Sequence, residues 1–107
     1  FLYESVLEQV ASWGSPEQLM FVVGATKAND LASIRKIIPA HFLLVPGVGA
    51  QGGSLSEVTK YGKNDVVGLL INASRAIIFA SNGANFAEDA AIAAKGYAAE
   101  MKALLSQ

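Results

Sequence analysis

The most chemically suggestive part of the sequence is a glycine-rich segment. Residues 47–53 contain four of the chain's ten glycines. Backbone N–H groups in such a segment can approach an anion without interference from side chains, and glycine permits the dihedral angles of an anion-binding nest. Gln51 adds the only long polar side chain, which can donate to an oxyanion and accept from a base. The segment therefore indicates an anion site, although a flexible glycine-rich turn explains the same pattern about equally well.

A second segment, which begins Asn72-Ala73-Ser74-Arg75, favours the anion interpretation. Arg75 lies a few residues after a predicted strand, and its guanidinium can form paired hydrogen bonds with a phosphate. Residues 76–80 are predicted to form a short helix whose N-terminus faces the same anion. A lone arginine more often forms a surface ion pair. With a glycine nest after the preceding strand, the ion pair becomes the weaker interpretation.

The elements that must position these segments follow from the hydrophobic pattern. Short continuous apolar runs predict strands buried on both faces, and apolar residues at helical spacing predict the helices between them. The expected helices are 2–13, a segment from Asn29 or Asp30 to Ile38, 54–62, and a last helix carrying Phe86 to Leu104; the expected strands are 20–23, 41–45 and 66–71. This alternation predicts a parallel sheet with right-handed crossovers. Both a doubly wound sheet and part of an eight-unit barrel satisfy it.

In either architecture, function gathers in the loops that follow the carboxyl ends of the strands. These are Gly24-Ala25-Thr26, the segment from Pro46 to Gly53, and the segment that begins at Asn72. Residues elsewhere have plainer interpretations: Ser54 and Glu57 form a capping box, Asp30 is a cap, Lys27 is exposed, and His41, Trp13 and Tyr97 are structural or packing residues.

Composition excludes several classes of function. The formal net charge is -1 and there is no basic run, so nothing predicts a nucleic-acid surface. The chain has no Cys and one His, which excludes thiolate chemistry and a multi-histidine metal site within it. No apolar run has the length of a membrane span, and the first residues do not resemble a signal peptide. Because the chain opens at Phe1 inside an amphipathic pattern, we expect it to be part of something longer.

Three strings, taken together, resemble one enzyme family. They are Val22-Val23-Gly24-Ala25-Thr26, Leu44-Val45-Pro46-Gly47-Val48-Gly49-Ala50-Gln51-Gly52-Gly53 and Leu69-Leu70-Ile71-Asn72-Ala73-Ser74-Arg75. Their order and spacing resemble the C-terminal part of orotidine 5'-phosphate decarboxylase, in the longer branch of that family. The likeness covers essentially all 107 residues.

The resemblance implies a fold and a set of site residues. The family fold is a (β/α)8 TIM barrel, so residues 1–107 are expected to be the C-terminal portion of a single barrel domain, about strands six to eight with their helices. The family decarboxylates orotidine 5'-phosphate to UMP in pyrimidine synthesis. By resemblance, the substrate phosphate would be bound by Gln51, Arg75, Ser74, Gly49 and Gly52, and the closing loop would include Pro46, Gly47 and Gly53.

The resemblance also implies a cytoplasmic enzyme that is active as a homodimer, with no metal, no organic cofactor, no nucleic acid and no membrane partner. Its chemistry depends on a Lys and Asp array that includes an Asp-x-Lys-x-x-Asp motif. That motif is absent from this sequence. No residue here is therefore assigned as catalytic, and the chain alone is expected to be inactive, with the remainder of the barrel as its partner.

Two other functions remain open on the residues alone. One is a different phosphate-binding barrel enzyme, such as one that acts on a sugar phosphate. The other is a non-catalytic half-barrel that binds a nucleotide phosphate. Three strands leave two open sheet edges, so a free-standing half-barrel would need to oligomerise.

Overall fold

The computed structural model describes residues 1–25, 27–49 and 53–107. Helices and strands alternate as the sequence predicts, and the predicted short helix precedes the last long one. The elements are α1 (Leu2–Ala11), β1 (Met20–Val22), α2 (Asp30–Ile37), β2 (Phe42–Pro46), α3 (Leu55–Gly62), β3 (Leu69–Asn72), α4 (Arg75–Ile78) and α5 (Phe86–Leu105).

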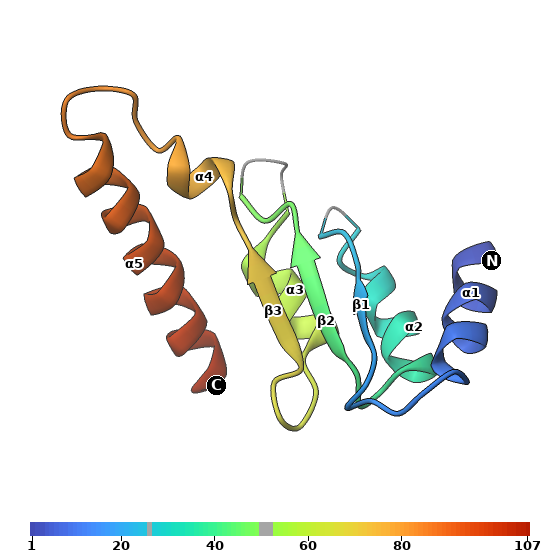
Figure 1. Ribbon diagram of the computed structural model, residues 1–107. Coiled ribbons are helices and arrows are strands. Elements are labelled where there is room, and N and C mark those ends of the chain that lie inside the picture. Colours follow the sequence, from blue (N-terminus) through green and yellow to red (C-terminus); the bar gives the residue numbers. More distant parts are fainter. Residues whose placement is uncertain (26, 50–52) are drawn as a thin grey trace.

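The three strands form one parallel sheet in the order β1-β2-β3. Leu43 pairs with Phe21 on one side and with Leu69 on the other. Figure 1 shows the carboxyl ends of the strands along the upper edge of the sheet, with α2 and α3 behind one face. The α5 helix lies beyond β3, and α1 lies beyond β1. The loops after β2 and β3 therefore leave the sheet at the same edge, as the candidate site requires.

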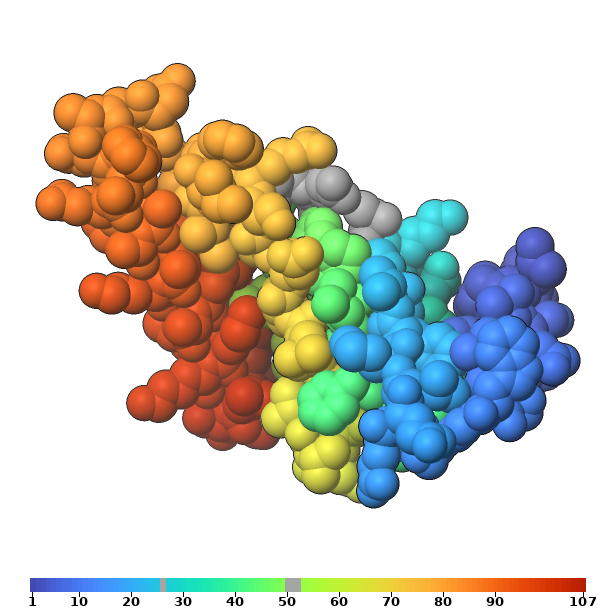
Figure 2. All heavy atoms as spheres, in the orientation of Figure 1, coloured from blue at the N-terminus to red at the C-terminus, as the bar shows by residue number. Residues whose placement is uncertain are grey.

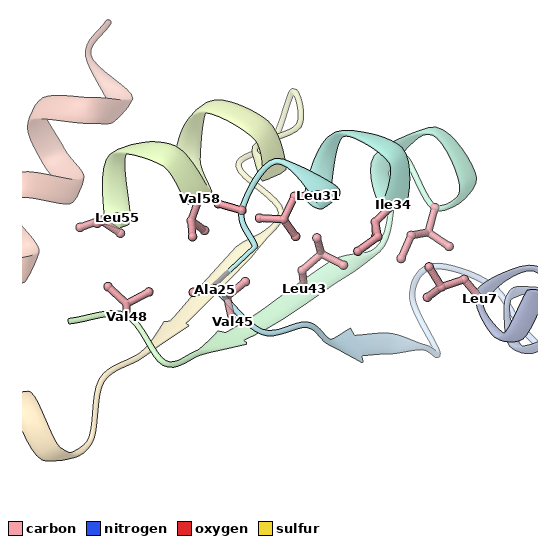
Figure 3. Close-up of a cluster of buried hydrophobic side chains, with 11 residues drawn as sticks. Leu7, Ala25, Leu31, Ile34, Leu43, Val45, Val48, Leu55 and Val58 are labelled. Carbon is pink, nitrogen blue, oxygen red and sulfur yellow. The ribbon is translucent and has the colours of Figure 1, made fainter. Parts of the chain in front are cut away.

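The core lies between the sheet and the helices behind it. Leu43 and Val45 of β2 point toward these helices and are fully buried, together with Leu31, Ile38 and Val58 (Figure 3). Two residues apart, Leu43 and Val45 share one face of the strand because side chains alternate across a sheet. The predicted apolar stripe of α2, which is Leu31, Ile34 and Ile38, is buried and confirmed.

The opposite face of the sheet is uncovered in this chain. Val22 is 71% exposed, and Met20, Phe42 and Leu70 are also exposed although their strands read as continuous apolar runs. Figure 2 shows this face toward the viewer, with no helix across it. The prediction of strands buried on both faces is therefore wrong for the chain by itself. A continuous apolar run indicates that both faces of a strand are suited to burial. In this chain, helices cover only one of the two faces.

An arginine joins the elements at the lower end of the sheet. The Arg35 side chain donates to the carbonyl oxygens of Gly62, Ile38, His41 and Gly68, and the last three distances are 3.1, 2.6 and 2.8 Å. Ile38 and Gly62 lie at the ends of α2 and α3, while His41 and Gly68 immediately precede β2 and β3. Partial burial lowers the pKa of the Arg35 guanidinium. This one side chain satisfies four backbone carbonyl groups where the chain turns, and these hydrogen bonds hold the guanidinium group in place.

His41 is buried beside this arginine, and its ring packs against Phe21 in a T-shaped arrangement with 5.4 Å between the ring centroids. Burial lowers the pKa of His41, and the nearby positive charge of Arg35 lowers it further. His41 lies at the end of the sheet away from the candidate site. This position agrees with the prediction that His41 is a structural residue.

Several element boundaries differ from the predicted ones for identifiable reasons. The first helix ends at Ala11, and Trp13, expected to pack, is 69% exposed. The third strand begins at Leu69 because residues 64–68 form a turn in which Val67 and Gly68 have φ values of 82° and 67°. Ser54 caps α3 as predicted, accepting from the Glu57 N–H at 3.3 Å.

Candidate functional site

A small pocket lies at the carboxyl edge of the sheet, between the ends of β2 and β3. Its volume is about 230 Å³, and a cavity needs only about 10–15 Å³ on this measure to hold one water molecule. Two segments line it: Pro46, Gly47 and Val48 after β2, and Asn72, Ala73, Ser74 and Arg75 after β3. The structure thus brings together the two segments that the sequence singled out. They meet because Pro46 and Asn72 are paired at the last position of the β2–β3 register.

The glycine-rich segment folds back on itself at its described ends. The Gly49 N–H donates to the Gly53 carbonyl at 3.0 Å, and the Gly53 N–H donates to the Gly47 carbonyl at 3.1 Å. Gly47 and Gly49 have φ values of 86° and 82°, which L side chains rarely adopt. The Gly49 N–H, named by resemblance among the phosphate contacts, thus donates within the loop in this structure. Its positive φ requires glycine at this position, so we assign Gly49 a role in shaping the loop.

Gly53 is required by space. A Cβ at this position would lie 2.7 Å from the Gly47 carbonyl oxygen and 2.6 Å from the Ala25 Cβ. The Ala25 N–H also donates to the Pro46 carbonyl at 3.2 Å. The loops after β1 and β2 therefore pack directly against each other, with Gly53 between them.

Arg75 begins α4 and is exposed at the pocket. Across residues 1–25, 27–49 and 53–107, the one ion pair joins the Phe1 amino group to Glu4, so Arg75 has no carboxylate partner in this part of the chain. The alternative interpretation of Arg75 as half of a surface ion pair is not supported. A charged guanidinium at the rim of a pocket is available for an anion.

Ser74 precedes α4, and its hydroxyl donates to the Asn72 Oδ1 at 3.3 Å. The predicted short helix is present, over Arg75–Ile78 in place of residues 76–80. Sequence reasoning did not name Asn72 as a site residue, although it lines the pocket. The signal was available: Asn72 is the one polar residue at the end of an otherwise apolar strand.

Gln51 and Gly52, expected to contact phosphate, and Thr26 of the first loop lie outside the described residues. Their roles stay predictions.

Residues 1–25, 27–49 and 53–107 contain neither a metal-binding cluster nor a membrane-spanning helix. No group of three or more His, Cys, Asp or Glu side chains gathers there in a way that could hold a metal ion. None of the helices there is both long and apolar enough to cross a membrane.

Known proteins similar to this chain include orotidine 5'-phosphate decarboxylases. No family model matches the chain. An orotidine 5'-phosphate decarboxylase from Flavobacterium johnsoniae is 64% identical over 89 residues, which are 83% of this chain and 33% of the relative. One from Christiangramia forsetii is 58% identical over 106 residues, which are 99% of this chain and 39% of the relative. The chain thus spans between a third and two fifths of the length of these relatives.

Solved structures extend the similarity to the fold. The Leishmania donovani OMP decarboxylase superposes with a TM-score of 0.79 at 35% identity, covering 97% of this chain and 38% of that one. A putative orotidine-monophosphate decarboxylase from Plasmodium yoelii gives a TM-score of 0.73 at 28% identity, covering 94% of this chain and 30% of that one. Of the two architectures left open by the sequence, the (β/α)8 barrel is confirmed: the three parallel strands and their helices are part of such a barrel.

Proposed function

We propose that this chain, which is homologous to part of the orotidine 5'-phosphate decarboxylases, supplies the phosphate-binding loops of an enzyme that converts orotidine 5'-phosphate to UMP. The observation that carries the proposal is the pocket between the ends of β2 and β3, with Arg75 at its rim and no carboxylate beside it in the described part of the chain. In this proposal, residues 1–107 are the C-terminal portion of one barrel domain. The complete enzyme is a cytoplasmic homodimer.

The chemical role of the pocket is to hold the end of the substrate that does not react. Arg75 provides the charge that pairs with the phosphate, and Ser74 provides a short polar side chain beside it. Gln51 and Gly52 complete the set of proposed contacts, while Pro46, Gly47, Gly49 and Gly53 shape the loop. Binding energy from a remote phosphate can be used to orient the pyrimidine and close the loop over it. The groups that act on the carboxylate itself belong to the remainder of the barrel.

The test uses a chimera in which this chain replaces the matching 106-residue segment of the Christiangramia forsetii decarboxylase. Charge-assisted hydrogen bonds contribute about 1.5–3 kcal/mol each, so loss of two in Arg75→Ala predicts a fall in kcat/KM for orotidine 5'-phosphate of about 100-fold or more. Orotidine, which lacks the phosphate, should react with the same low kcat/KM in both proteins. The matched control is Lys63→Ala, which removes an exposed positive charge at the other end of the sheet.

An equal loss for both substrates would indicate general damage and count against the assignment. An unchanged preference for the phosphorylated substrate in Arg75→Ala would overturn it.

A further inference from the structure

The two segments that line the pocket are both approached from one side by a tyrosine of the last helix. Tyr97 lies in the middle of α5 and is half-buried. It packs against the core on the same helix face as Met101 and Leu104. Sequence reasoning treated it as a packing residue, and its ring is one. Its hydroxyl group extends beyond the core to the loop after β2.

The hydroxyl of Tyr97 ends at the loop after β2. A Cβ placed on Gly49 would collide with the Tyr97 Oη, and the Tyr97 Cζ would lie 3.4 Å from it. The Ala76 Cβ would be equally near, at 3.4 Å. Ala76 follows Arg75 in α4. The phenol therefore ends at a point shared by the glycine-rich loop and the helix that carries the arginine.

This contact completes the support of Gly49. On one side, its N–H is held by the Gly53 carbonyl. On the other side, the Tyr97 hydroxyl occupies the space into which a side chain at position 49 would project. Gly49 is thus held by a hydrogen bond within the loop and contacted by a side chain from a helix 48 positions later in the sequence.

We propose that Tyr97 is a positioning residue for phosphate binding. Its hydroxyl group keeps the loop after β2 at a fixed distance from α4, so that the groups of both segments reach one phosphate together. This inference rests on the proposed function of the pocket. It adds a residue outside the pocket lining and assigns the role to the hydroxyl group, with the ring serving the core.

The experiment compares Tyr97→Phe and Tyr97→Leu in the chimera defined above. Tyr97→Phe keeps the ring in the core and removes only the oxygen atom that touches the loop. Because small misplacements of binding groups weaken catalysis, kcat/KM for orotidine 5'-phosphate should fall roughly tenfold, mainly through KM. The Kd for UMP should rise by a similar factor. Tyr97→Leu, which also removes the ring, should cause a larger loss.

Orotidine separates positioning from general stability, because a nucleoside without phosphate does not use the supported loops. Its kcat/KM should stay unchanged in Tyr97→Phe. The matched control is Tyr61→Phe, since Tyr61 also packs against the core but lies at the end of α3 away from the pocket. That variant should leave both substrates unaffected.

Two results would overturn the inference. One is an unchanged KM and UMP affinity in Tyr97→Phe, whatever Tyr97→Leu does; the other is an equal loss for orotidine and its phosphate, which indicates a structural role only. Arg75→Ala, measured alongside, distinguishes the two proposals. If Arg75→Ala loses the phosphate preference and the Tyr97 variants do not, the positioning role alone fails. If Arg75→Ala keeps that preference, the pocket is not the phosphate site and both proposals fail.

Discussion

At the scale of single residues, two arginines in this chain serve opposite purposes. The Arg35 side chain donates hydrogen bonds to four backbone carbonyls at the lower end of the sheet. Arg75 is exposed at the upper end and has no carboxylate partner in the described part of the chain. The sequence distinguished Arg75 because it follows a strand. It could not identify Arg35, because the four acceptors come from separate parts of the chain and only the fold brings them together.

Substitution of Arg35 should be costly for stability. Arg35→Met leaves four backbone acceptors without their charged donor, so we expect the free energy of unfolding of the chimera to fall by about 3 kcal/mol or more. Lys36→Met is the matched control: it removes a charge from the neighbouring, exposed position and should change stability by less than about 0.5 kcal/mol. Urea unfolding measures both. A loss for Arg35→Met no greater than that of the control would show that the four hydrogen bonds contribute little.

At the scale of elements, the sequence predicts the type and order of the helices and strands well. It predicts their exact boundaries and the layers that cover them less well. The stripe of α2 and the Ser54 cap were predictable because each depends on residues a few positions apart. The start of β3 was not, because the apolar pair Val66 and Val67 resembles a strand although Val67 has a positive φ. Gln51 is a case in which the sequence does not predict the position of a side chain. The resemblance assigns it a role, but it lies in a loop, where neither hydrophobic periodicity nor a helix cap determines its position.

The contact between the first two loops gives a prediction at this scale. Gly53→Ala places a methyl group between the Gly47 carbonyl and Ala25, so the loop after β2 must shift. We expect kcat/KM for orotidine 5'-phosphate in the chimera to fall about tenfold or more, because a shifted loop misplaces the groups that it presents to the substrate. Gly83→Ala is the control, since no atom lies within 4 Å of a Cβ there. Full activity in Gly53→Ala would show that the two loops separate easily.

At the scale of the whole molecule, the chain is a three-stranded section whose sheet is covered on one face only. Met20, Val22, Phe42 and Leu70 present apolar side chains on the uncovered face. Among the residues that the structure describes, both outer strands also have an edge without a neighbouring strand. A parallel sheet is normally covered on both faces, so this section is expected to need the remaining strands of a barrel.

The isolated 107-residue chain should therefore have no decarboxylase activity. It should also self-associate, which light scattering would detect, because its apolar sheet face and strand edges are accessible. Co-expression with the complementary segment of the Christiangramia forsetii decarboxylase should restore turnover of orotidine 5'-phosphate. The control is the same pair carrying Arg75→Ala, which should assemble but turn over slowly. Turnover by the purified chain alone would contradict the absence of the catalytic array.

The hydrogen bonds of Arg35 have one more consequence, for protein engineering. Substitutions that stabilise an enzyme often reduce its activity, because active sites tend to need strained or mobile segments. Here the residues that hold the lower end of the sheet are separated from the pocket by the full length of the strands. Mutations that raise thermal tolerance can therefore be sought around Arg35 and the turn at residues 64–68, where the usual trade-off between robustness and turnover should be weakest.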